Sequence, residues 1–117
     1  MIMIVDDSPQ MRTVIRRFLQ KMNADREYHE CDDGHEAVEA YERLRPEWVL
    51  MDVKMQGMDG LLATESILQK YPKAKIVIVT NFDEPELRAA AQRAGAHGYV
   101  TKDRLWELRN LISWMES

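Results

Sequence analysis

Three aspartates that follow apolar runs are the first candidates for chemistry in this sequence. Asp6 and Asp7 follow the run 2–5, and Asp52 follows the run 48–51. Short apolar runs of this kind suit strands that are buried on both faces, as in a parallel sheet. Ligands bind at the carboxyl ends of such strands, so neighbouring strands would bring the carboxylates together. Three carboxylates so close cannot all stay ionised without a cation, and their oxygens suit Mg²⁺.

Two later polar residues could complete a site for phosphoryl chemistry. Thr80 ends the run 75–80, and Lys102 follows the short run 98–101. A carboxylate such as Asp52 can attack a phosphoryl group and form an aspartyl phosphate, a reaction that needs chiefly positioning and charge neutralisation. Lys102 would bind a phosphoryl oxygen as a point charge, and Thr80 could donate a hydrogen bond to another.

A competing interpretation gives the aspartates structural roles only. Asp6 and Asp7 would then cap the next helix, and Asp52 would merely end a strand. That account suffices for one aspartate, but three at matching strand ends favour a shared chemical role.

Length, charge and composition limit the class of protein. The 117 residues suffice for one domain with one core, and a chain with 45% hydrophobic and 31% charged residues has ordinary globular composition. The net charge of −4 argues against general nucleic-acid binding, which needs a basic surface. The sequence contains neither an apolar run of membrane-spanning length nor a signal-peptide pattern. We therefore expect a cytoplasmic protein that binds neither membrane nor nucleic acid directly.

The cysteine and histidine content predicts no disulfide and no zinc site. Cys31 is the one cysteine, and no Cys/His cluster has zinc spacing. We interpret Cys31 as a small packed residue, and His29, His35 and His97 as scattered surface or loop residues.

Hydrophobic periodicity predicts five strands that alternate with five helices. The expected strands are 2–5, 26–31, 48–52, 75–80 and 98–101, the second of them an exposed or edge strand. Apolar residues at three- and four-residue steps predict an amphipathic helix after each strand. This order predicts an α/β fold with a doubly wound parallel sheet, helices on both faces and right-handed crossovers.

Capping residues mark where several of these helices are expected to begin. Ser8 followed by Pro9 is typical of a helix start. Capping-box spacings occur at 33–36 and 83–86. Asp103 is expected to cap the last helix.

The candidate residues lie in short segments that together resemble one known family. These segments are 5–8, 51–55, 57–60, 79–80, 94–96 with 98–99, and Lys102. In this order and spacing they are similar to the receiver domain of two-component response regulators, over nearly the whole chain. The resemblance implies a five-stranded flavodoxin-like sheet of order 2-1-3-4-5, with residues 1–117 forming a single receiver domain.

The resemblance also implies a phosphorylation site and a metal site. Asp52 would accept a phosphoryl group from a sensor histidine kinase or a phosphotransfer protein. Asp7 and Asp52 would bind Mg²⁺ directly. The backbone carbonyl of Lys54 would be a further ligand, and Asp6 would act through water.

The same resemblance implies a switch. Thr80 would move toward the phosphate and Tyr99 would turn inward. The face formed by the fourth helix, fifth strand and fifth helix would then contact a downstream output protein or a second copy of the chain.

Two positions depart from the usual family pattern. Gln56 stands where many receivers have proline, and we expect it to loosen the loop without removing chemistry. Asp103 follows Lys102 where many receivers have a cis-proline, and a cis bond is improbable before a residue other than proline. Receivers of the nitrate-response class, which are joined to helix-turn-helix DNA-binding domains, often share this second feature.

Two side chains are expected to tune how long the phosphoryl group survives. Lys54 and Phe82 stand two residues beyond Asp52 and Thr80, where they would flank the approach of water to the phosphorus. Neither can act as a base or hold an attacking water as a carboxylate or amide could. We therefore expect slow hydrolysis.

Three other functions compete with a phosphorylation-controlled switch. A degenerate receiver would serve as a phosphorylation-independent interaction module, but all five chemical positions are retained. An acid-phosphatase-type hydrolase usually has a second aspartate two residues after a nucleophile on the first strand, where this chain has Ser8. A nucleotide-binding function is disfavoured because no glycine-rich loop follows the first strand. We expect no enzyme activity beyond self-phosphorylation and autodephosphorylation with Mg²⁺.

Overall fold

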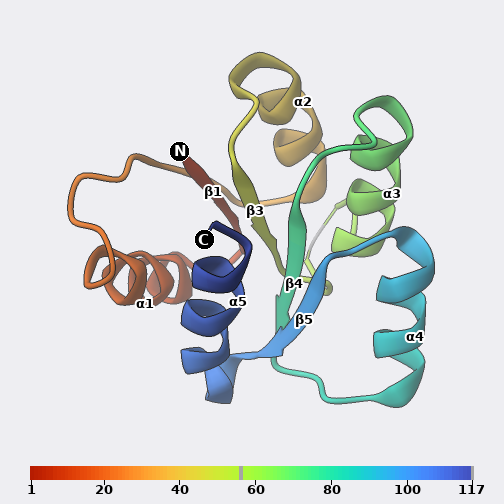
Figure 1. The fold of residues 1–117 in the computed structure, drawn as a ribbon. Coiled ribbons are helices and arrows are strands. Elements are labelled where there is room, and N and C mark those ends of the chain that lie inside the picture. Colours follow the sequence, from red (N-terminus) through yellow and green to blue (C-terminus); the bar gives the residue numbers. More distant parts are fainter. Residues whose placement is uncertain (56, 117) are drawn as a thin grey trace.

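The computed structural model describes residues 1–55 and 57–116, the last three of them by backbone alone. In these residues one parallel sheet has the strand order β2-β1-β3-β4-β5, which confirms the predicted doubly wound fold (Figure 1). The strands are β1 (Ile2–Val5), β2 (Tyr28–Cys31), β3 (Trp48–Met51), β4 (Ile76–Thr80) and β5 (Gly98–Thr101). The helices are α1 (Pro9–Gln20), α2 (Gly34–Leu44), α3 (Gly60–Lys70), α4 (Pro85–Ala94), the 3₁₀ turn η1 (Lys102–Arg104) and α5 (Trp106–Glu116).

Helices cover both faces of the sheet because successive strand residues point in opposite directions. Ile2 and Ile4 pack into the core layer beneath α1 and α5, whereas Met3 and Val5 belong to the layer beneath α2 and α3. Figure 1 shows α1 and α5 on one side of the sheet and α2, α3 and α4 on the other. Each inner strand must therefore be apolar along its length, which leaves the strand ends for polar chemistry.

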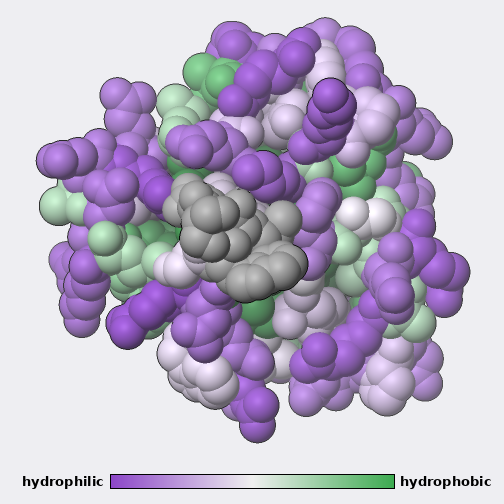
Figure 2. Space-filling model, viewed as in Figure 1, coloured by the Kyte–Doolittle hydropathy of each residue, from purple (hydrophilic) through white to green (hydrophobic). Residues whose placement is uncertain are grey.

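The surface is largely polar outside these two core layers. Figure 2 shows hydrophilic residues over most of the viewed face, with hydrophobic residues in separate patches. The described helices include none long and apolar enough to cross a membrane.

Two of the predicted helix starts are confirmed. The Ser8 hydroxyl accepts a hydrogen bond from the Met11 N–H at 3.2 Å, with Pro9 at the first helical position. At α2, Oδ1 of Asp33 accepts from the Glu36 N–H at 2.9 Å. The Glu36 carboxylate accepts from the N–H of Asp32 at 3.2 Å, one residue earlier than a capping box predicts.

Two other predicted caps are wrong. The N-cap of α4 is Glu84, whose side chain makes no capping hydrogen bond. Asp83, the predicted cap, does not cap the helix because its carboxylate pairs with Nε of Arg88 at 2.8 Å. Asp103 does not cap α5, because it lies inside η1 and α5 begins only at Trp106. In both places a local spacing suggested a cap, and a contact or turn outside that spacing decided the structure.

The second strand is shorter than predicted, because it begins at Tyr28 and not at residue 26. The N–H of Arg26 bonds back to the carbonyl of Asn23 at 3.4 Å and so belongs to a turn. Pairing with β1 reaches only to Glu27, whose carbonyl accepts the N–H of Ile2 at 2.9 Å.

Candidate functional site

Three carboxylates converge at the carboxyl edge of the sheet, where β1 and β3 end. Val5 pairs in register with Met51, so the residues that follow them, Asp6 and Asp52, are brought side by side. One carboxylate oxygen from each of Asp6, Asp7 and Asp52 lies within 4.8 Å of the others. The predicted convergence is confirmed.

Burial distinguishes the three carboxylates. Asp6 and Asp52 are 1% and 6% exposed, whereas Asp7 is exposed. An all-oxygen donor set that is partly open to water fits Mg²⁺, which keeps several waters when it binds to protein carboxylates. Oδ2 of Asp6 also lacks an aligned hydrogen-bond donor among the described residues, and so retains capacity to interact with a cation or its waters.

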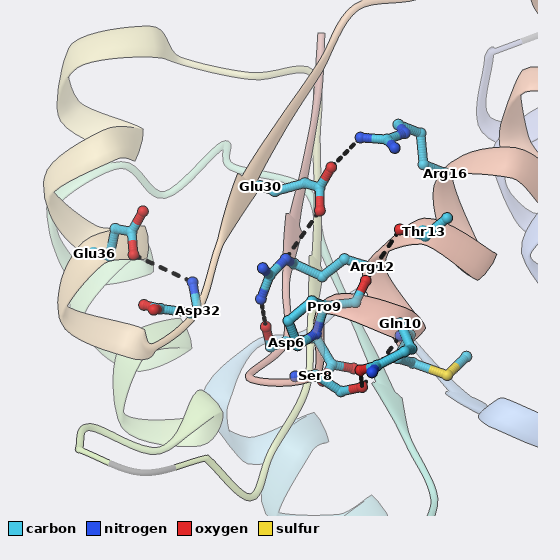
Figure 3. Close-up of polar contacts among 11 residues, drawn as sticks. Asp6, Ser8, Pro9, Gln10, Arg12, Thr13, Arg16, Glu30, Asp32 and Glu36 are labelled. Carbon is cyan, nitrogen blue, oxygen red and sulfur yellow. Dashed lines mark hydrogen bonds and ion pairs between the residues drawn. The ribbon is translucent and has the colours of Figure 1, made fainter.

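Backbone and side-chain contacts hold Asp6 in place. Its Oδ1 accepts the N–H of Ser8 at 2.9 Å, and its carbonyl accepts from Nη1 of Arg12 at 2.6 Å. Nε of Arg12 donates to Glu30 on β2 at 2.9 Å, and Arg16 also pairs with Glu30 (Figure 3). Arg12 thus ties the end of β1 to the neighbouring strand.

Sequence analysis missed the positioning role of Arg12 and Glu30. Helical periodicity places Arg12 on the polar face of α1, but its partner stands 18 residues further along the chain. Only the packing of α1 beside β2 brings the two together, so no local pattern could have identified the pair.

Lys102 enters the pocket from the end of β5. Its Nζ lies 2.8 Å from Oδ2 of Asp6 and 3.2 Å from Oδ2 of Asp52. The ammonium is ion-paired with Asp6 even though its direction of approach does not satisfy hydrogen-bond geometry there. The described residues contain no cis peptide bond, so Lys102 reaches the site through a trans bond to Asp103, as expected.

Burial and charge shift the titration of this pair. Burial raises the pKa of Asp52 above its usual value; the Lys102 charge opposes this rise, and the Asp6 charge adds to it. Burial alone would lower the pKa of Lys102, but its interactions with Asp6 and Asp52 outweigh burial, so that pKa is raised. Lys102 is therefore a cation at neutral pH, beside a carboxylate whose charged form is disfavoured.

Phe82 joins the two predicted switch residues. Thr80 is fully buried at the end of β4, and its Oγ1 accepts the N–H of Phe82 at 3.4 Å. The Tyr99 hydroxyl donates to the carbonyl of Phe82. The Arg88 guanidinium lies 4.6 Å from the centroid of the Tyr99 ring. Thr80 and Tyr99 are thus linked through the backbone of one residue.

The two predicted tuning residues contact one another. Nζ of Lys54 lies 3.9 Å from the centroid of the Phe82 ring, which is cation–π distance. Lys54 is exposed and Phe82 is 38% exposed, so the contact lies at the surface. Gln56, where many receivers have proline, lies outside the described residues.

Gly60 lets the loop after Asp52 fold back on the strand. A Cβ at Gly60 would lie 1.8 Å from the carbonyl oxygen of Asp52, which no side chain could accommodate. The Gly60 N–H donates to the carbonyl of Val53 at 2.9 Å. Glycine is therefore required at the start of α3 for the loop to close against the end of β3.

Comparison with known proteins places this pocket in a family. The profile of the response regulator receiver domain matches residues 2–113. Receiver domains are signalling modules, and this match covers nearly the whole chain. The chain belongs to the response regulator receiver domain family.

Relatives share both sequence and structure with the chain. It is 39% identical over 101 residues to the response regulator GacA of Pseudomonas viridiflava, covering 86% of this chain and 47% of that one. It is 37% identical over 104 residues to the chemotaxis protein CheY of Halobacterium salinarum, covering 86% and 82%. The crystal structure of a LuxR-family DNA-binding response regulator from Staphylococcus aureus superposes with a TM-score of 0.88 at 29% identity, covering 99% and 98%. The chain spans about half the length of GacA and similar curated relatives.

Removing the charge of Asp52 is expected to stabilise the metal-free fold. Because the pKa of Asp52 is raised on folding, its ionised form destabilises the folded state. This loss of folding free energy is absent at a pH below the pKa of Asp52 in the unfolded chain. It grows as the pH rises and is complete above the raised pKa of Asp52 in the folded protein. Asp52→Asn should therefore increase the free energy of unfolding by about 1 kcal/mol at pH 7 and have little effect near pH 3.

Urea unfolding in chelator at both pH values would measure this difference. Asp25→Asn, which changes an exposed carboxylate in the α1–β2 connection, is the matched control and should leave stability nearly unchanged. A clear loss of stability in Asp52→Asn at pH 7 would show that Asp52 supports the structure instead.

Proposed function

We propose that the protein is a phosphorylation-activated switch of a two-component system and that Asp52 is its phosphoacceptor. The donor is the phosphohistidine of a sensor histidine kinase or a phosphotransfer protein, in the cytoplasm. One observation carries this proposal: Lys102 Nζ lies between Asp6 and Asp52, 2.8 and 3.2 Å from their oxygens, in a pocket where three carboxylates meet. Family membership supports it.

In the proposed transfer, a carboxylate oxygen of Asp52 attacks the phosphorus of the phosphohistidine. A P–O bond forms and the P–N bond breaks, and the electron pair of that bond leaves with the imidazole. The product is an acyl phosphate on Asp52. The Lys102 ammonium, already 3.2 Å from the Asp52 carboxylate, stabilises the negative charge of the phosphoryl oxygens as a point charge.

Mg²⁺ is the cofactor in this proposal. Asp7 and Asp52, the backbone carbonyl of Lys54, and Asp6 through water would hold it. When bound, Mg²⁺ neutralises charge on the phosphoryl oxygens. The exposure of Asp7 leaves the pocket open to a hydrated cation.

The proposed relay runs through Phe82. Thr80 turns its hydroxyl toward the phosphoryl group and gives up a long hydrogen bond of 3.4 Å from the Phe82 N–H. Tyr99, held by the carbonyl of the same residue, then turns inward. The surface formed by α4, β5 and α5 changes as a result and binds an output protein or a second copy of the chain.

The alternative is a phosphorylation-independent interaction module. It would not require a lysine bridging two buried carboxylates, and burying these charges carries a desolvation penalty that their attraction need not repay. The alternative predicts no covalent modification, so phosphorylation itself separates the two functions.

Intact mass after incubation with a small acyl phosphate donor and Mg²⁺ is the direct test. We expect a gain of one phosphoryl group in the wild type, no gain in Asp52→Asn, and no gain when chelator replaces Mg²⁺. The exposed control Asp25→Asn should be modified like the wild type. Absence of the gain in the wild type would favour the interaction module, and steady turnover of the donor without a modified protein would favour a hydrolase.

Metal affinity should depend unequally on the two N-terminal aspartates. Asp7→Ala should nearly abolish Mg²⁺ binding, because a direct carboxylate ligand is lost from a site with few others. Asp6→Ala should weaken binding less, because its contact is expected through water and Ser8 and Lys102 already engage its oxygens. Calorimetric titration with Mg²⁺ would measure both, and equal affinity of wild type and Asp7→Ala would contradict the assignment.

The phosphoryl group should survive longer than in receivers with water-orienting side chains at the two tuning positions. Hydrolysis requires water in line with the phosphorus. Lys54 and Phe82 contact one another at 3.9 Å where they would flank that approach. Lys54→Asn and Phe82→Glu should therefore both accelerate decay of the phosphorylated protein after donor removal.

Asp25→Asn is again the control for the decay measurement, because this exposed carboxylate in the α1–β2 connection is outside the residues that would flank the water path. Its decay rate should match the wild type. Unchanged or slower decay in both Lys54→Asn and Phe82→Glu would show that these side chains do not control the access of water.

A further inference from the structure

A second group of metal-binding side chains lies at the edge strand β2, outside the acidic pocket. One ligand atom from each of His29, Cys31 and Glu36 lies within 4.8 Å of the others. His29 and Cys31 stand two apart on β2, so their side chains share a face of the sheet. Glu36 comes from the first turn of α2, which packs beside β2. Figure 3 shows Glu36 above the β2–α2 connection.

The two strand residues have donor atoms that nothing else engages. Cys31 is 1% exposed, and its free thiol has no hydrogen-bond partner in the described part of the chain. The imidazole of half-buried His29 likewise has no hydrogen-bond partner among the described residues. A packed thiol alone would need no partner. An imidazole and a carboxylate that converge on it make a donor set that could hold a metal ion.

The surroundings of this group favour a cation. Asp32 and Asp33 place carboxylate oxygens within 4.8 Å of Glu36 as well as of one another. The charges of Glu36, Asp32 and Asp33 all act on the Cys31 thiol, so a bound cation would relieve their mutual repulsion.

We propose that His29, Cys31 and Glu36 bind Zn²⁺, with water as the fourth ligand. Imidazole nitrogen, thiolate sulfur and carboxylate oxygen are the three ligand types that Zn²⁺ takes in proteins. Binding forms the Zn–S bond as the thiol releases its proton to solvent, with no change of oxidation state. Mg²⁺ is no competitor here, because it requires oxygen ligands.

The geometry needs only a small adjustment to bind the ion. Ligand atoms around a tetrahedral Zn²⁺ lie about 3.5 Å apart, from its bond lengths of about 2.0 to 2.3 Å. The exposed Glu36 side chain can rotate to close the remaining gap, in exchange for its 3.2 Å hydrogen bond from the Asp32 N–H. Sequence spacing predicted no zinc site because the third ligand is a glutamate, Glu36, which helix packing brings to the two strand residues.

The proposed zinc site adjoins the residues that position Asp6 in the acidic pocket, but it does not depend on phosphorylation. The carbonyl of Cys31 accepts the N–H of Asp6 at 3.0 Å, and neighbouring Glu30 holds Arg12. Bound Zn²⁺ would thus link α2 to β2, the strand that pairs with β1 and so lies next to Asp6. This assignment rests on residues separate from Asp52 and stands whether or not that residue is phosphorylated.

Co²⁺ is the probe for this site, because a thiolate-to-Co²⁺ charge-transfer band reports sulfur ligation and Cys31 is the one cysteine in the chain. With excess Mg²⁺ present, we expect a band that saturates at one Co²⁺ per chain and disappears when Zn²⁺ is added. Cys31→Ser should abolish it. His29→Gln and Glu36→Gln should weaken Co²⁺ binding by more than the roughly tenfold that loss of an outer-shell contact costs, because each removes a direct ligand.

His35→Gln is the matched control, because this exposed histidine of α2 is outside the ligand group, and it should bind Co²⁺ like the wild type. Asp52→Asn should also retain the band, which separates this site from the acidic pocket. If Cys31→Ser does not fold, the two glutamine variants at the ligands decide the result. A band that is absent, that is insensitive to both of those variants, or that forms only between two chains would overturn the proposal.

Discussion

An excess of negative charge held out of water is the constraint on which the rest of the structure depends. Two carboxylates that are nearly buried, Asp6 and Asp52, share one ammonium, and Asp7 adds a third negative charge at the pocket mouth. Like charges in a poorly solvated site repel strongly, so this arrangement opposes folding. It persists because the backbone around it is fixed by other means. The hydrogen-bonded ladder and the two apolar core layers hold the ends of β1 and β3 in register, and the N–H of Ser8 and the Arg12–Glu30 pair hold Asp6 itself.

The same imbalance makes the pocket responsive to added charge. If all three carboxylates were ionised, the pocket together with Lys102 would carry a charge of −2. A divalent cation would bring this sum to about zero, and a phosphoryl group on Asp52 would then make it about −1, since the modified side chain carries about −2 in place of −1. Without the cation the phosphorylated pocket would carry about −3. The proposed phosphorylation of Asp52 would therefore be helped by a divalent cation in addition to Lys102.

The sequence was informative where the structure depends on local pattern and uninformative where it depends on packing between distant segments. Apolar runs ending in polar residues predicted the sheet, and with it the meeting of Asp6, Asp7 and Asp52, because parallel strands place their carboxyl ends at one edge. The predicted cap at 83–86 was wrong because Asp83 pairs with Arg88, and the role of Arg12 was missed because its partner lies on β2. The grouping of His29 and Cys31 with Glu36 was invisible for the same reason. Each of these contacts is decided by which helix packs against which strand.

Phe82 makes contacts that its predicted tuning position does not reveal. Its N–H contacts Thr80, its carbonyl accepts from Tyr99, and its ring lies under Lys54. These partners come from the end of β4, from β5 and from the loop after β3. Two of the three contacts use backbone atoms, which every residue possesses, so no side-chain pattern could reveal them. The contact with Thr80 is long at 3.4 Å and therefore weak, which makes it the easiest of the three to exchange for another acceptor or donor. In the proposed switch, a displacement of Thr80 toward Asp52 would release the Phe82 N–H and leave this backbone free to shift together with its Tyr99 contact, which would couple the pocket to β5.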